Sequence, residues 1–176
     1  IRTGMTLADA RAILPDLQTS EADFEAENRA LTQLGDWCGR FSPWTAPDED
    51  GSGHAFGGAG SVWLDVTGCA HLFGGEDALM RDIISRLDTI GFTACAAIAD
   101  TPGAAWAAVR YTAYKRKRWT NVARGRARDV IAAMPVAGLR LAPATIAGLQ
   151  AVGLRRIGDL MPIPRTALVD RFGSEV

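Results

Sequence analysis

The sequence predicts an α+β fold over its first two thirds and a purely helical fold over its last third. The run Ser-Val-Trp-Leu-Asp-Val-Thr at residues 61–67 is rich in β-branched and aromatic side chains, which favours a strand. Apolar positions at helical spacing lie on both sides of it, at residues 21–37 and 75–89. From residue 128 onward, short helical patterns alternate with glycine or proline. At 176 residues and 48% hydrophobic content, the chain can bury one sizeable core or two small ones.

Two helices are predicted near the start of the chain. Residues 6–14 have apolar side chains at helical spacing, Thr6 can cap their N-terminus, and Pro15 ends the helix. Residues 21–37 form a longer amphipathic pattern. The acidic side chains near its start match the positive end of the helix dipole.

The strands are predicted to be short. Residues 41–45 and 61–67 are predicted strands, and the acidic, glycine-rich residues 47–60 between them form a loop. After the helix at residues 75–89, small side chains at residues 92–99 predict another strand. A helix that begins at Asp100 or Thr101 and runs to about residue 111 follows it, with Pro102 in its first turn.

The last part of the chain is predicted to consist of short helices. They are expected at residues 128–134, 143–152, 156–161 and 164–172. Segments 138–154 and 153–173 each pair a short helix with a glycine-containing turn, a spacing typical of helix-hairpin-helix units that bind phosphate through backbone N–H groups. A small helical bundle without a ligand is the alternative.

The net charge of −1 conceals a strong asymmetry. Residues 1–109 contain 6 basic and 16 acidic side chains, and residues 110–176 contain 13 and 4. A basic cluster between residues 110 and 128 includes Lys115, Arg116, Lys117 and Arg118. Such a cluster is typical of polyanion binding, and a solvated linker is the alternative.

Several classes of protein are disfavoured by composition. No apolar run approaches the roughly 20 residues that span a bilayer, and the first residues lack a signal-peptide pattern, so a fragment of a cytoplasmic protein with no membrane contact is expected. Cys38, Cys69 and Cys95 lie far apart, which favours reduced thiols over a disulfide framework. His54 and His71 lack the further ligands of a metal site. No metal and no cofactor are expected.

The order of motifs resembles that of Y-family DNA polymerases, the group that contains DinB and UmuC. Leu-Asp-Val-Thr-Gly at residues 64–68, Phe73-Gly74, a helix and a small-residue strand are similar to the palm of these enzymes. Residues 1–15 resemble the segment at the end of the fingers, and residues 153–160 with 171–173 resemble the thumb.

The resemblance implies an antiparallel, ferredoxin-like palm sheet with helices on one face and a small all-helical thumb with helix-hairpin-helix-like units. The expected domains are a remnant of the fingers at residues 1–18, the palm at 19–114, a basic linker at 115–127 and the thumb at 128–176.

The departures from the family pattern concern catalysis. Aligning Trp63 to Val66 with the family's Tyr-Leu-Asp-Val puts Gly60 and Ser61 where the polymerases carry the Asp-Glu pair that holds two magnesium ions. Two-metal phosphoryl transfer needs several anionic oxygens, which neither residue supplies. Trp106 aligns with a lysine that meets the phosphates of the incoming nucleotide.

Two other sources of metal ligands are disfavoured. Asp65 aligns with a family residue that is not a metal ligand, so a structural role is expected for it. The alternative ligands Asp48, Glu49 and Asp50 precede a glycine-rich loop and do not lie on a rigid strand.

Within the family, residues 64–75 and 99–107 resemble the ImuB group. That resemblance implies a catalytically inactive DNA-binding adaptor in bacterial DNA damage tolerance, error-prone translesion synthesis and induced mutagenesis. Its partners would be primer-template DNA, ImuA, the sliding clamp and an error-prone C-family polymerase, mostly through regions outside this chain. The alternatives are an active translesion polymerase with relocated metal ligands, and an acidic palm that docks proteins beside a thumb that does not touch DNA.

The residues expected to contact DNA are basic or lie in the thumb turns. They are Lys115, Arg116, Lys117, Arg118, Arg140, Thr145, Arg155 and Arg156. Residues 140–143 replace a Gly-Val-Gly type turn of the family, and their Cβ atoms are expected to hinder close approach of phosphate. Trp37, Trp44 and Trp63 are expected in the core, and Trp119 is the candidate for stacking on a base.

Overall fold

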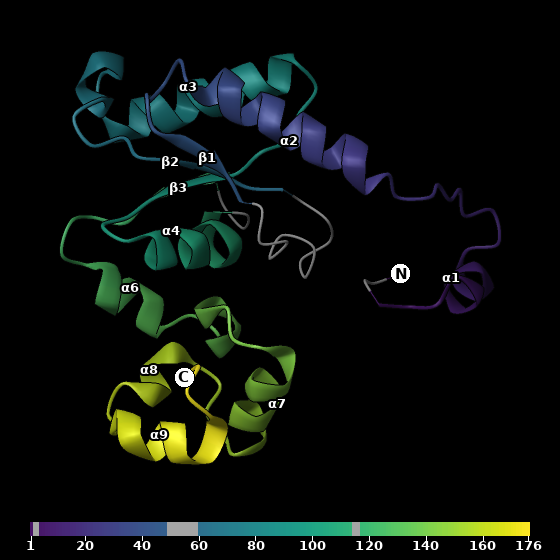
Figure 1. Ribbon diagram of the computed structural model, residues 1–176, viewed down its shortest axis with the longest axis vertical. Coiled ribbons are helices and arrows are strands. Elements are labelled where there is room, and N and C mark those ends of the chain that lie inside the picture. Colours follow the sequence, from purple (N-terminus) through teal and green to yellow (C-terminus); the bar gives the residue numbers. More distant parts are fainter. Residues whose placement is uncertain (2–3, 49–59, 114–116) are drawn as a thin grey trace. The chain divides into compact units, whose positions relative to one another are not determined.

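The computed structural model describes residues 1, 4–48, 60–113 and 117–176 (Figure 1). The chain divides into two compact units, Ile1–Cys69 and Ala70–Val176. This division does not test the expected domain borders, which stay predictions. Among the described residues, none of the helices is both long enough and apolar enough to span a bilayer.

The first unit contains both predicted N-terminal helices. Helix α1 (Leu7–Ile13) begins at Thr6, whose hydroxyl oxygen accepts a hydrogen bond from the Asp9 N–H at 3.1 Å. Helix α2 (Phe24–Cys38) is capped by Asp23. These contacts confirm the cap predicted at Thr6 and show that the second helix begins slightly later than expected.

Strands β1 (Thr45–Pro47) and β2 (Val62–Leu64) form an antiparallel pair in the first unit. Thr45 pairs with Leu64 and Pro47 with Val62. The sequence predicted a strand at residues 61–67, and the structure confirms its centre. The strand predicted at residues 41–45 begins only at Thr45. Before it, the buried Ser42 forms a turn, because its hydroxyl oxygen accepts a hydrogen bond from the Trp44 N–H at 3.1 Å.

The second unit begins with a 3-10 turn, η2 (Ala70–Phe73), and helix α3 (Glu76–Thr89). Strand β3 (Ala96–Ile98) follows, then α4 (Pro102–Ala108), which continues as the π-helical turn η3 (Val109–Ala113). Helix α3 buries one face, formed by Leu79, Met80, Ile84 and Leu87, which confirms its predicted periodicity.

Strand β4 (Trp119–Asn121) pairs with β3 in parallel, which the sequence did not predict. The antiparallel palm sheet is therefore found only for β1 and β2 among the described residues. A parallel pair needs a crossover connection, and α4 with η3 supplies it. Trp119 and Thr120 have strand propensity, but the adjacent basic run made residues 115–127 resemble a linker.

The end of the second unit is helical, as predicted. Its elements are α6 (Ala127–Ala132), the 3-10 turn η4 (Val136–Leu139), α7 (Pro143–Ala151), α8 (Ile157–Leu160) and α9 (Arg165–Phe172). Figure 1 shows α7, α8 and α9 gathered around a common centre, where the buried core consists of Val136, Leu149, Leu160 and Leu168.

Gly153 ends α7 in a left-handed conformation with φ of 88°. The Leu154 N–H reaches back to the Leu149 carbonyl at 3.0 Å, and Leu154 packs against the core cluster that contains Leu149. This is the hydrogen bond and apolar contact of a Schellman-type helix end, where glycine adopts positive φ at little cost.

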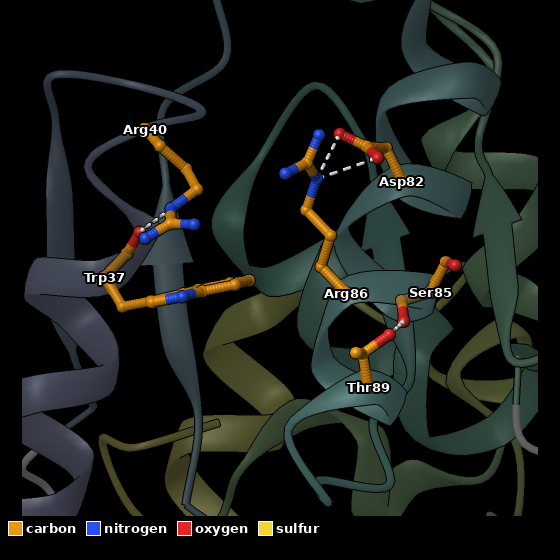
Figure 2. A network of polar contacts seen from close by, with 6 residues as sticks. All are labelled: Trp37, Arg40, Asp82, Ser85, Arg86 and Thr89. Carbon is orange, nitrogen blue, oxygen red and sulfur yellow. Dashed lines mark hydrogen bonds and ion pairs between the residues drawn. The ribbon is translucent and has the colours of Figure 1, made fainter.

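Local polar contacts support two helices that lie in different units (Figure 2). After the end of α2, the Arg40 Nε donates to the Trp37 carbonyl at 2.9 Å, and the guanidinium lies 4.3 Å from the centre of the indole ring. In α3, the Arg86 Nε lies 2.9 Å from both carboxylate oxygens of Asp82, one turn earlier. Such pairs stabilise a helix locally.

We expect Leu149→Ala to lower the free energy of unfolding by about 2–5 kcal/mol, because Leu149 is fully buried in the helical core and the truncation leaves a cavity. Urea denaturation followed by circular dichroism measures the change. Val152→Ala is the control, since Val152 is exposed in the same segment and should have little effect. Equal effects of the two substitutions would refute this assignment of the core.

Candidate nucleic-acid interface

The two positions aligned with the metal-binding acids of the polymerases offer no carboxylate. A Cβ atom added at Gly60 would lie 2.8 Å from Cδ1 and 3.2 Å from Cδ2 of Leu31, a side chain of α2. Ser61 pairs through its carbonyl, which accepts from the Asp48 N–H at 2.8 Å. An apolar contact and a neutral hydroxyl do not fit a pair of divalent cations, which need several anionic oxygens.

Asp65 has the structural role that was expected for it. Its Oδ1 accepts a hydrogen bond from the Thr67 N–H at 2.9 Å, which forms an Asx turn. Hydrogen bonds from Thr67, first from its side chain and then from its N–H, lower the pKa of the Asp65 carboxyl below its usual value. Among the described residues, no three His, Cys, Asp or Glu side chains come together as a metal site.

Trp106, at the position of the phosphate-binding lysine, is buried in α4. The guanidinium carbon of Arg110 lies 4.0 Å from the centre of the indole ring, and that of Arg140 lies 5.6 Å from it. Cation–π attraction favours this arrangement. Two guanidinium groups thus lie against the indole at the position that aligns with a single lysine of the polymerases.

Arg140 keeps a backbone conformation that usually favours glycine. Its φ is 61°, and it ends η4 two residues before Ala142, which begins α7. The left-handed region is costly for a residue with a Cβ atom, so surrounding contacts must hold it there. The ring of Trp106 under the guanidinium is one such contact.

The predicted basic cluster is described only in part, since Lys115 and Arg116 lie outside the described residues. Lys117 is exposed, with its Nζ 6.0 Å from the centre of the Trp119 ring. Arg118 forms a two-pronged ion pair with Asp88, at 2.7 and 2.6 Å. A guanidinium held by a carboxylate has less charge to offer a phosphate than a solvated one.

Arg155 and Arg156 line a hollow of about 770 Å³ in the second unit. The other lining residues include Tyr111, Thr112 and Gln150. The Tyr111 phenol is protonated at neutral pH and is a hydrogen-bond donor, and burial raises its pKa further. The hollow combines two cations with hydrogen-bonding groups, a combination suited to an anionic ligand.

Two carboxylates of the chain bind at the helical turns where phosphate contacts were expected. The Glu175 carboxylate accepts from the Thr145 hydroxyl and from the Ala142 N–H, the latter at 3.3 Å. The Asp159 carboxylate accepts from the backbone N–H groups of Arg155 and Arg156 at 3.0 and 2.8 Å, which lowers its pKa. A phosphate at these N–H groups would have to compete with a carboxylate.

The structure thus brings some of the predicted DNA-contacting residues together, whereas others bind carboxylates of the chain itself. Arg155 and Arg156 share one hollow, Thr145 is engaged by Glu175, and Arg118 by Asp88. Sequence reasoning missed Tyr111, Thr112 and Gln150, which line the same hollow as the arginines. No local signal marks them, because Tyr111 and Thr112 lie in η3 and Gln150 lies in α7, far apart in the sequence. None of these observations tests DNA contact, which stays a prediction.

Trp44 corrects the expectation that the first three tryptophans lie in the core. Its side chain is 73% exposed, whereas Trp37 and Trp63 are half-buried. Its side chain projects from the turn that Ser42 holds at the start of β1. The apolar character of an indole predicted burial, and the turn overrode it.

A strand preceded by Gly60 and Ser61, followed along the chain by a crossover unit and a helical end, is the order of elements expected of a relative of the Y-family polymerases. The impB/mucB/samB family matches residues 1–110, and the chain belongs to this family. It is 44% identical over 170 residues to Protein ImuB from Caulobacter vibrioides strain NA1000 / CB15N, and equally to that from strain ATCC 19089 / CIP 103742 / CB 15. These matches confirm the resemblance.

Each match covers 97% of this chain and 34% of the relative, so the chain spans about a third of the length of these curated relatives. No solved structure matches the chain. The family is therefore shown by sequence, and the activity of a whole protein of this kind is a matter for proposal.

The ion pair of Arg118 predicts a pH effect. Its hydrogen bonds lower the pKa of Asp88, so the pair stabilises the fold above the pKa that Asp88 has when unfolded. That stabilisation is lost as the pH falls through the lower, folded pKa. We expect Arg118→Gln to raise the pKa of Asp88 toward its ordinary value, as measured by NMR titration. The loss of folding stability that this substitution causes should vanish at acid pH.

Arg126→Gln is the matched control, because Arg126 forms an exposed ion pair with a different carboxylate, Asp129, at 2.9 Å. It should leave the pKa of Asp88 unchanged. The assignment is wrong if Asp88 titrates alike in both variants.

Proposed function

We propose that the chain is the palm and thumb region of a catalytically inactive Y-family polymerase relative, which acts as a DNA-binding adaptor in bacterial DNA damage tolerance. The observation that carries the proposal is the pair Gly60 and Ser61 at the positions of the metal-binding acids. The surroundings of Gly60 support it, since the atoms nearest to an added Cβ belong to the apolar side chain of Leu31 in α2. The similarity to Protein ImuB supports the role in damage tolerance.

The DNA-binding part of the proposal depends on cationic side chains in the second unit. Lys117, Arg140, Arg155 and Arg156 are all exposed. Backbone N–H groups at the thumb turns already donate to Glu175 and Asp159. DNA contact would therefore depend more on side-chain charge than on backbone donors, which favours sequence-independent binding to phosphates.

The partners expected of such an adaptor are ImuA, the sliding clamp and an error-prone C-family polymerase, which would perform the synthesis. These bridging contacts belong to the proposal and are assigned mostly to regions outside this chain. The second candidate is an active translesion polymerase with relocated ligands. Asp48 and Asp65 are the acids on the β1–β2 ladder that favour it, but the Asp65 carboxylate already accepts from Thr67.

We expect the full-length protein to extend no primer on a primed template with magnesium or manganese, while an active Y-family polymerase does so beside it. The double substitution Gly60→Asp with Ser61→Glu should also fail to extend, because Trp106 still stands at the position aligned with the phosphate-binding lysine and Leu31 must shift to admit a Cβ at position 60. Gel electrophoresis of labelled primers measures both. Templated extension by the unchanged protein would refute the proposed loss of catalysis.

A second prediction concerns the salt dependence of DNA binding by the full-length protein. Removing one cation that neutralises a phosphate lowers the slope of log affinity against log salt by about 0.9. We expect the triple substitution of Lys117, Arg155 and Arg156 by Gln to reduce the slope by about 2–3, measured by fluorescence anisotropy with a primer-template duplex.

Arg118→Gln is the matched control for charge. It removes one cation that Asp88 already engages, so its effect on the slope should be smaller than that of Arg155→Gln or Arg156→Gln alone. An unchanged slope in the triple variant would exclude these residues from the DNA contact.

A further inference from the structure

The β1–β2 ladder sorts the side chains of the first unit onto two faces. The Asp65 N–H donates to the Trp44 carbonyl at 3.0 Å, and the Asp48 N–H donates to the Ser61 carbonyl at 2.8 Å, so the pairing extends one residue beyond each end of the strands. Opposed residues share a face, and successive residues alternate between faces. One face, termed here the tryptophan face, consists of Trp44, Ala46, Asp48, Ser61, Trp63 and Asp65.

Helix α2 covers the opposite face. A Cβ atom added at Gly35 of α2 would lie 3.5 Å from Cδ of Pro47, and one added at Gly60 would meet Leu31 of the same helix. Pro47 and Gly60 both alternate with residues of the tryptophan face. The tryptophan face is therefore the side of this ladder that α2 leaves uncovered.

Trp44 is an exposed aromatic side chain on a firmly held backbone. The side chain is 73% exposed, yet its N–H donates to the buried Ser42 hydroxyl and its carbonyl accepts from Asp65. The Ser42 hydroxyl in turn donates to the Asp65 carbonyl. Because the backbone is fixed before any partner arrives, binding at the indole needs little additional ordering.

The charge of this face selects the partner. Asp48 and Asp65 are acidic, and none of the six residues of the tryptophan face is basic. The Asp65 carboxyl is charged at neutral pH, and the side-chain and backbone hydrogen bonds from Thr67 lower its pKa further. Residues 1–69 contain 4 basic and 11 acidic side chains. Such a field repels the phosphates of nucleic acid and attracts cations.

We infer that the tryptophan face docks an arginine-containing segment of a partner protein, with a guanidinium stacked on Trp44 and paired with Asp65. Guanidinium groups bind both indole rings and carboxylates, and Trp and Arg are enriched among the residues that dominate protein interfaces. The inference rests on the proposed loss of catalysis, since in a working polymerase the position of Ser61, which lies on this face, would carry a metal-binding acid. It adds a protein-docking surface to the DNA contacts of the second unit.

The test uses the full-length protein and a fluorescein-labelled dodecapeptide of alternating arginine and leucine. A dodecapeptide of alternating glutamate and leucine and a single-stranded oligonucleotide are the comparison probes. We expect the arginine peptide to bind at this face, and the glutamate peptide and the oligonucleotide not to bind there. Trp44→Ala should weaken its binding by about tenfold or more in fluorescence anisotropy. Asp65→Asn should weaken peptide binding less, because an asparagine oxygen can still accept from the Thr67 N–H. It should also reduce the salt dependence of binding, because it removes the negative charge.

Leu72→Ala is the matched control, because Leu72 is as exposed as Trp44, at 73%, and lies in the second unit. It should leave peptide binding unchanged, and thermal melts should show that Trp44→Ala stays folded, since little buried surface is removed. Equal binding of the arginine peptide to unchanged protein and Trp44→Ala would overturn the inference. So would a selective loss of oligonucleotide binding in Trp44→Ala, which would make the face a nucleic-acid platform.

Primer extension separates the two failures. If the full-length protein extends primers, the proposed function fails whatever the peptide does. If it extends none and the arginine peptide binds independently of Trp44, the docking inference alone fails.

Discussion

The alternation of side chains along the β1–β2 ladder is the constraint on which the first unit depends. Because α2 covers one face, Gly60 is directed toward Leu31 while Trp63 and Asp65 project from the other side. A side chain at position 60 would require the end of the Leu31 side chain to shift. The same alternation places Trp44 beside Asp65 and gives the uncovered face its aromatic and acidic character.

In the second unit, carboxylates of the chain accept hydrogen bonds from an arginine side chain and from groups at the helical turns. Asp88 holds Arg118, Asp159 accepts from the backbone at Arg155 and Arg156, and Glu175 binds at the start of α7. Each of these carboxylates binds a hydrogen-bond donor that was expected to contact phosphate. The proposed affinity for DNA therefore depends on cations that remain exposed, and such affinity is strongly weakened by salt.

The two units suit different partners by charge. The acidic first unit repels nucleic acid, and the basic second unit attracts it. The proposed adaptor would use both, because it would bind DNA and protein at once. In the proposed inactive relative, Ser61 stands on the tryptophan face where a polymerase would carry a metal-binding acid, and this leaves the face open to a protein partner.

The sequence by itself determined the helices, the strand at residues 62–64 within the predicted 61–67, the charge asymmetry and the membership of the polymerase family. Periodicity, caps such as Thr6 and residue identities are local properties that a single chain reveals. Only the tertiary structure decided the parallel pairing of β4, the exposure of Trp44 and the grouping of Tyr111 and Gln150 with the arginines. These features depend on which distant segments meet, and strand propensity or side-chain polarity carries no information about the partner across a fold.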